Sequence, residues 1–107
     1  MKTVVETPAY LAAAKDAGMT EAERTAAVLT LAANPEAGDL IQGTGGCRKV
    51  RVAGRGKGKS GGYRVITYFA LGAGRVFLLT VFSKGERSDL SPKEKAALAA
   101  VAKTIDR

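Results

Sequence analysis

Hydrophobic residues recur along this chain at two different spacings, and the spacing changes near residue 38. In the N-terminal part the period is helical, as for Ala27 and Leu31. Further on, apolar and polar residues alternate, so that Val50 and Val52 lie on one side of a strand and the charged residues between them lie on the other. The pattern therefore predicts helices first and strands after them.

Two helices are predicted in the N-terminal part, after a short strand at residues 3–6. Pro8 suits the first turn of the first helix, which ends near Gly18. The segment Thr20–Glu23 has the form of a capping box, because the hydroxyl can cap the third helical N–H while the glutamate reaches back. The second helix therefore begins there, and it ends before the Asn-Pro pair at residues 34–35.

Strands dominate the centre of the chain. Three are predicted, at residues 48–53, 63–70 and 76–83. Residues 39–41 fit either a short strand or a turn, and a second capping box at Ser91–Glu94 begins a final helix. The order β-α-α-β-β-β-α predicts an α+β fold, with helices covering one face of an antiparallel sheet. We expect residues 1–107 to form a single domain.

The composition excludes several classes of protein and site. The chain has one cysteine, so it has no intrachain disulfide and no cysteine-based zinc site, and Cys47 is expected to be a small buried hydrophobe. It has no histidine, the usual acid and base of nucleases. No apolar run approaches the ~20 residues of a membrane span, and the N-terminus does not resemble a secretory signal. We expect a cytoplasmic protein without a metal or other cofactor.

Positive charge is concentrated in one part of the chain. Residues 43–90 hold ten of the 17 Lys and Arg residues but only two of the ten Asp and Glu residues, a formal charge of +8. Residues 1–42 carry −3 and residues 91–107 carry +2. Because the basic segment is also the predicted sheet, it indicates a surface that binds a polyanion, most plausibly a nucleic acid.

The glycine-rich segment Gly54–Gly62 resembles two phosphate-binding motifs. It contains Gly-Lys-Ser, as in a P-loop, and a GxGxxG spacing. Both motifs need a helix directly after the loop, whereas the sequence that follows here predicts a strand. The segment is therefore interpreted as a hairpin loop, in which Arg55, Lys57 and Lys59 are candidates for phosphate contacts.

Four cations are expected to converge on neighbouring strands or at their ends. They are Lys49, Arg51, Arg64 and Lys84. Such a group repels itself in the free protein, and a bound anion would relieve the repulsion. Tyr68 and Phe82 fit two roles, either stacking on bases or packing in the core.

Several linked motifs resemble the HigB branch of the RelE-like bacterial toxins. They are GTGG-x-RK-x-R, GKGKSGG-x-R, and the pair Lys84-x-Glu86 leading into Asp89-Leu90-Ser91, and the match covers about residues 35–100. The resemblance implies an antiparallel sheet with two N-terminal helices and a C-terminal helix. It also implies cleavage of mRNA in the A site of the small ribosomal subunit. The implied partner is a HigA-like helix-turn-helix antitoxin.

The resemblance also assigns roles to individual residues. It implies that Lys49, Arg51, Arg64 and Lys84 act on the scissile phosphate. The sequence departs from RelE at Gly85, where RelE has an arginine, and at Ser91, where it has a base-stacking tyrosine. Glu86 and Arg87 fill part of that gap. The predicted RNA-binding residues are Arg48, Arg55, Lys57, Lys59, Tyr68, Phe82, Glu86 and Arg87.

RNA cleavage without histidine is chemically reasonable, because RNA carries its own nucleophile. The 2′-OH attacks the adjacent phosphate, which requires neither a metal nor an external water. Lys49 is the candidate base, Arg64 the charge stabiliser, and Arg51 or Lys84 the group that assists the leaving oxygen. Two alternatives stay open. One is a non-catalytic RNA-binding or ribosome-binding module, and the other is a ParE-type gyrase inhibitor on the same fold.

Overall fold

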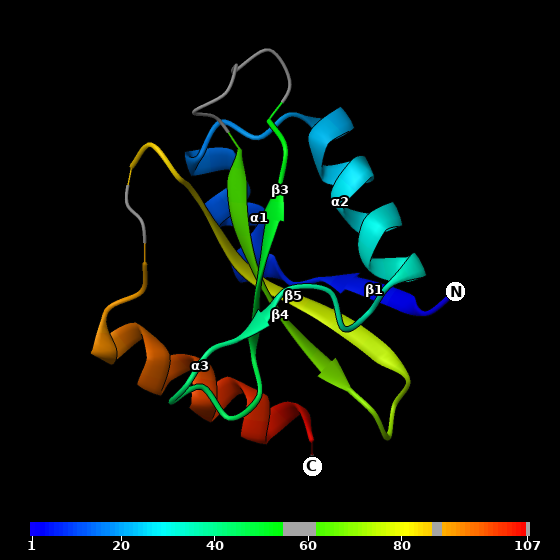
Figure 1. Ribbon diagram of the computed structural model, residues 1–107, viewed down its shortest axis with the longest axis vertical. Coiled ribbons are helices and arrows are strands. Elements are labelled where there is room, and N and C mark those ends of the chain that lie inside the picture. Colours follow the sequence, from blue (N-terminus) through cyan, green and yellow to red (C-terminus); the bar gives the residue numbers. More distant parts are fainter. Residues whose placement is uncertain (55–61, 87–88, 107) are drawn as a thin grey trace.

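The computed structural model describes residues 1–54, 62–86 and 89–106. The elements follow the order β1 (Thr3–Glu6), α1 (Pro8–Asp16), α2 (Glu21–Ala33), β2 (Asp39–Leu40), β3 (Arg48–Val52), β4 (Tyr63–Ala70), β5 (Arg75–Ser83) and α3 (Pro92–Ile105) (Figure 1). This order confirms the α+β prediction, and it makes residues 39–40 a short strand rather than a turn. None of the helices in the described ranges has the length and apolar content that crossing a bilayer requires.

The strands form one five-stranded sheet in the order β1-β5-β4-β3-β2. The sheet is antiparallel from β5 to β2, and β1 extends it at the edge by pairing in parallel with β5. The parallel pairing follows from the connection, because a helical hairpin separates β1 from the rest of the sheet. The central hairpin of β4 and β5 therefore lies at the middle of the molecule.

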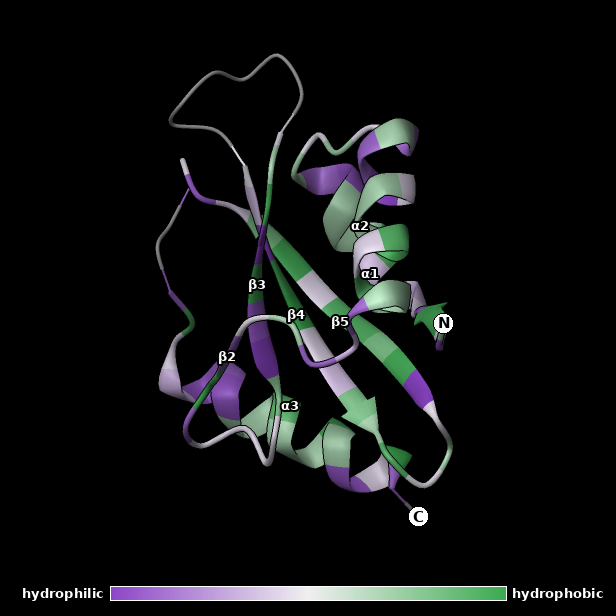
Figure 2. Cartoon of the chain, turned by 45° about the vertical axis from the view of Figure 1, so that its right-hand side comes forward, coloured by the Kyte–Doolittle hydropathy of each residue, from purple (hydrophilic) through white to green (hydrophobic). Residues whose placement is uncertain are grey.

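Helices cover both faces of the sheet, and the expectation that they cover one face is wrong. One cluster of buried residues joins Tyr10 of α1 and Leu31 of α2 to one face of β3, β4 and β5. A second cluster joins Leu98 and Ala102 of α3 to the other face. Figures 1 and 2 show α1 and α2 on the side of the sheet opposite α3. Cys47 is fully buried in the second cluster, as predicted.

The alternation of β3 determines which residues face each helical layer. Val50 and Val52 are buried against α1 and α2, so Lys49 and Arg51 lie on the face toward α3. Figure 2 shows hydrophilic positions recurring along β3, whereas β5 is hydrophobic over most of its length. Lys49 and Arg51 of β3 are therefore presented on the α3 side of the sheet.

Candidate nucleic-acid interface

Cations from two strands meet on the α3 side of the sheet. Arg51 of β3 lies directly opposite Arg64 of β4, and Lys49 lies opposite Ile66, one step along the same face. Residues paired in this way have Cβ atoms about 5 Å apart, and like charges in such pairs destabilise a sheet. The register therefore confirms that Lys49, Arg51 and Arg64 converge, and we call these three residues the cation cluster.

Arg64 holds a polar atom without a partner. Its side chain is half-buried, and its Nη1 is buried without a hydrogen-bond partner among the described residues. A buried N–H of a charged group is costly to leave unpaired, and the residue opposite Arg64 in the strand pairing is a second arginine. An anion placed between Arg64 and Arg51 would supply the missing acceptor and reduce the repulsion.

Lys49 differs from the two arginines because it has an acidic partner. Its Nζ lies 3.6 Å from Oδ1 of Asp89, at the start of α3. The pKa of Asp89 is lowered, first by the backbone N–H of Leu90 and then by Lys49, with a smaller effect of Lys95. The carboxylate is therefore ionised at neutral pH. The sequence predicted only cationic neighbours for Lys49, and the structure adds this anion to its surroundings.

Lys84 and Glu86 lie in the turn that follows β5. The backbone N–H of Lys84 donates to the carbonyl of Gly62 at 3.2 Å, so the turn lies beside the start of β4, next to the cation cluster, and the Lys84 side chain is exposed. Glu86 closes the turn, since its N–H donates to the Ser83 carbonyl at 3.0 Å and its carboxylate accepts from the Ser83 N–H. Glu86 also shares a hollow with Asp16 of α1, away from Arg51.

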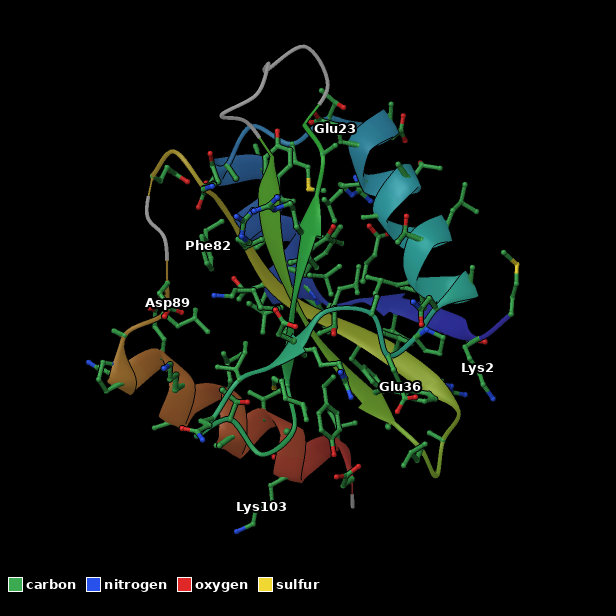
Figure 3. The ribbon with its side chains drawn as sticks, in the orientation of Figure 1. Lys2, Glu23, Glu36, Phe82, Asp89 and Lys103 are labelled. Carbon is green, nitrogen blue, oxygen red and sulfur yellow. The ribbon has the colours of Figure 1, made fainter. Side chains whose placement is uncertain are left out.

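The two aromatic candidates are core residues. Tyr68 and Phe82 are 8% and 3% exposed, and both belong to the buried cluster beneath α3. The Tyr68 hydroxyl donates to the carboxylate of Asp106, which raises the pKa of Tyr68 to about 12, with burial adding to the effect. Figure 3 shows Phe82 beside β5, where it lies opposite Arg64 in the strand pairing. Of the two roles weighed for these rings, the core role fits their burial.

Among the described residues, one further predicted RNA-binding residue, Arg48, is not part of the cation cluster. Arg48 lies on the opposite face of β3, and its Nη1 donates to the carbonyl of Gly38 at 3.1 Å. Four other candidates lie outside the described residues, and they are Arg55, Lys57, Lys59 and Arg87. Among the described residues, no three His, Cys, Asp or Glu side chains gather closely enough to hold a metal ion.

Two residues near the cluster are not identified by the sequence patterns. Asp89 belongs to a motif without an assigned role, and Lys95 belongs to none. A signal for Lys95 exists, because it precedes the buried Leu98 by three residues and therefore shares the sheet-facing side of α3. The partner of Asp89 has no signal in the sequence, since 40 positions separate it from Lys49.

Comparisons with known proteins identify the family and the fold of this chain. A family model described as RelE toxin of the RelE / RelB toxin-antitoxin system matches residues 2–107. Among solved structures, a double arginine-to-alanine mutant of the E. coli toxin RelE in the free state is similar, with a TM-score of 0.56 at 15% sequence identity. That match covers 94% of this chain and 95% of the other, and at this identity it supports the fold alone. The family match extends over nearly the whole chain, and the protein therefore belongs to the RelE toxin family of toxin-antitoxin systems.

Proposed function

We propose that this toxin is an endoribonuclease that cleaves mRNA in the ribosomal A site and so inhibits translation. The observation that carries the proposal is the buried Nη1 of Arg64, which has no hydrogen-bond partner among the described residues, in a residue paired with Arg51 across the sheet. A cationic group that lacks its acceptor is suited to an anionic ligand, and a phosphodiester fits the charge.

The reaction requires little from the protein beyond positioning and charge. The 2′-oxygen of one nucleotide attacks the adjacent phosphorus, loses its proton, and displaces the 5′-oxygen of the next nucleotide. The products are a 2′,3′-cyclic phosphate and a free 5′-OH; the base takes the proton of the 2′-OH, and the acid supplies the proton of the new 5′-OH. The protein must hold the chain in line, stabilise the pentacoordinate phosphorane, and move those protons.

The cation cluster supports a division of these tasks. A guanidinium is a poor proton donor, so the role proposed for Arg64 and Arg51 is to stabilise the phosphorane oxygens. Lys49 is the proposed base for the 2′-OH, and in this step it would act as the free amine. Lys84 is the proposed acid for the leaving oxygen, because an ammonium releases a proton far more readily than a guanidinium. General acid–base catalysis of this kind contributes about 10²- to 10⁴-fold.

The test compares two arginines of the same sheet. We expect Arg64→Ala to reduce cleavage by roughly 10²- to 10³-fold, as loss of a group that stabilises the transition state does. Arg75→Ala is the matched control, because Arg75 is exposed and lies at the far end of β5. Cleavage is read by primer extension on mRNA from induced cells, and circular dichroism verifies the fold. Full cleavage by a folded Arg64→Ala protein would refute the site.

The same experiment separates this function from its alternatives. Growth arrest with intact mRNA and a DNA-damage response would indicate a ParE-type gyrase inhibitor. RNA binding without growth arrest or cleavage would indicate a non-catalytic RNA-binding or ribosome-binding module. Shortened transcripts in arrested cells are expected only for the nuclease.

The proposal also includes the branch of the family, the antitoxin partner, the extent of the toxin domain and its place in the cell. The motifs quoted above support the HigB branch, a HigA-like helix-turn-helix antitoxin, and action of residues 1–107 as one toxin domain in the cytoplasm. Co-purification with the product of the neighbouring gene tests the antitoxin. We expect a toxin dialysed against EDTA, freed of the chelator and then added to programmed ribosomes to cleave mRNA undiminished, since the 2′-OH mechanism has no step that needs a metal on the protein.

A further inference from the structure

Asp89 is an anion placed within a surface that otherwise gathers cations. It lies where the chain reaches α3 (Figure 3), and its carboxylate is 3.6 Å from the ammonium of Lys49. The Asp89 side chain is 57% exposed, whereas that of Lys49 is 28% exposed. An ion pair with one partner so open to solvent is weak and easily exchanged for another anion.

A second lysine approaches the same carboxylate from α3. Lys95 is half-buried, and it shares a helix face with Leu98 and Ala102, which pack on the sheet. Its positive charge contributes to the lowered pKa of Asp89. Lys93, two positions earlier, is exposed and lies on a different side of the helix. Asp89 is therefore paired with a lysine of β3 and lies within electrostatic reach of a lysine of α3.

The position of Asp89 beside the cation cluster suggests that its carboxylate takes the place of an RNA phosphate. Lys49 is one step along the sheet face from the pair of Arg51 and Arg64, so the cations continue from that pair through Lys49 to α3. An RNA strand bound with its scissile phosphate at the arginines would carry its neighbouring phosphate along this line. A carboxylate and a phosphate offer the same kind of acceptor to an ammonium.

We propose that Asp89 occupies, in the RNA-free protein, the place of an RNA phosphate between Lys49 and Lys95, and that Lys95 is a further RNA-binding residue. Binding of RNA then exchanges the carboxylate for a phosphate. This inference rests on the proposed function, because it assumes that the cation cluster binds RNA. It makes Asp89 a competitor of RNA within the protein itself, and it extends the RNA-binding surface to Lys95 on α3.

The test measures binding of a short single-stranded RNA that is 2′-O-methylated throughout and so cannot be cleaved. Fluorescence anisotropy over a series of salt concentrations gives the affinity and its salt dependence. Asp89→Asn should bind roughly two- to five-fold more tightly, the range that corresponds to losing one exposed competing ion pair. Lys95→Ala should bind more weakly, with a salt slope smaller by about 0.7, because one phosphate of the single-stranded RNA is then no longer neutralised. Lys93→Ala is the matched control and should leave the slope unchanged.

Several outcomes overturn the proposal. Equal or weaker binding by Asp89→Asn would show that the carboxylate does not compete with RNA. Equal slopes for Lys95→Ala and Lys93→Ala would remove Lys95 from the RNA path. If the wild-type protein fails to bind this RNA yet cleaves mRNA on ribosomes, the exchange fails while the proposed function stands. The expected shifts in binding without any mRNA cleavage would instead refute the nuclease.

Discussion

At the scale of single residues, some buried polar groups have hydrogen-bond partners among the described residues and others do not. Thr44 and Thr67 are both fully buried. The hydroxyl of Thr44 donates to the Ile41 carbonyl at 2.6 Å and accepts from the Cys47 N–H at 3.1 Å. The hydroxyl of Thr67 has no partner among the described residues, like Nη1 of Arg64. The two unpaired groups differ in setting, because Thr67 lies inside the sheet core and Arg64 at the cation cluster.

This difference gives the two threonines opposite effects on stability. Thr67→Val replaces an unpaired hydroxyl with a methyl group of similar size, so we expect the free energy of unfolding to rise by about 1 kcal/mol. Thr44→Val removes two hydrogen bonds and leaves a buried N–H unpaired, so we expect a loss of about 2 kcal/mol. Urea denaturation measures both. A destabilised Thr67→Val protein would mean that the hydroxyl is satisfied in solution.

At the scale of elements, the start of α3 serves both the fold and the site. Ser91 accepts from the Glu94 N–H at 3.1 Å, and the Glu94 carboxylate accepts from the Ser91 N–H at 2.8 Å. This capping box fixes the first turn of α3, which carries Lys95 and directly follows Asp89. The side chain of Ser91 is therefore used to cap the helix.

Removing the cap should therefore lower the stability of the fold, without a direct effect on mRNA cleavage. We expect Ser91→Ala to lower the free energy of unfolding by about 1 kcal/mol, the usual cost of losing an N-cap hydroxyl. Ser91→Thr keeps the cap and should remain near the wild-type value. Both are measured by urea denaturation. If Ser91→Ala abolishes mRNA cleavage while Ser91→Thr and stability are unaffected, Ser91 contacts RNA directly.

Gly38 controls the approach of the chain to β3. Its φ is +91°, and a Cβ at this position would lie 2.4 Å from the carbonyl oxygen of Lys49, a backbone atom that cannot move alone. Gly38→Ala should therefore displace β3, with a loss of stability of roughly 2 kcal/mol or more and reduced cleavage. Gly72→Ala is the control, because a Cβ there meets nothing within 4 Å. Thermal unfolding compares the two, and equal stability would contradict the close approach.

The sequence predicted the elements well because their signals are local. Capping boxes located the starts of α2 and α3, and the alternation of β3 correctly separated Val50 and Val52 from Lys49 and Arg51. The side of the sheet that α3 covers was not predictable from its own period. Between β4 and β5, Thr67 pairs with Leu78 and Ile66 with Thr80, so Leu79 is an extra residue. This bulge breaks the alternation of VFLLTVFS and hides which residues face α3.

The site was predicted less completely than the fold, for a related reason. The sequence pattern placed the cations on neighbouring strands, and the structure supplies the register that pairs Arg51 with Arg64. The roles of Tyr68 and Asp89 depend instead on contacts with α3, since Tyr68 bonds Asp106 at its C-terminal end and Asp89 precedes its first turn. A sequence prediction that places all three helices on the same face of the sheet excludes both of these contacts with α3.

At the scale of the whole molecule, the three tyrosines of the chain tie the helical layers to the sheet. Tyr10 of α1 and Tyr63 of β4 are buried between the sheet and the N-terminal helices, and Tyr68 is buried beneath α3. The pKa of Tyr10 is raised to about 12, mainly by burial and then by Glu6. Burial and the hydrogen bond to Glu23 raise the pKa of Tyr63. Both layers therefore depend on protonated phenols.

This arrangement predicts cooperative unfolding at alkaline pH. A tyrosine whose pKa is higher in the folded state than its unfolded value of about 10 stabilises the protein fully below pH ~10. That stabilisation is lost as pH rises toward 12, the value of Tyr10 and Tyr68. We expect tyrosinate absorbance to appear together with the loss of circular dichroism, in one steep transition above pH ~10. The urea-unfolded chain should titrate gradually near pH ~10. Gradual titration of the folded protein at the same pH would show that its phenols reach solvent without unfolding, and the two helical layers would then not be held to the sheet as the structure describes.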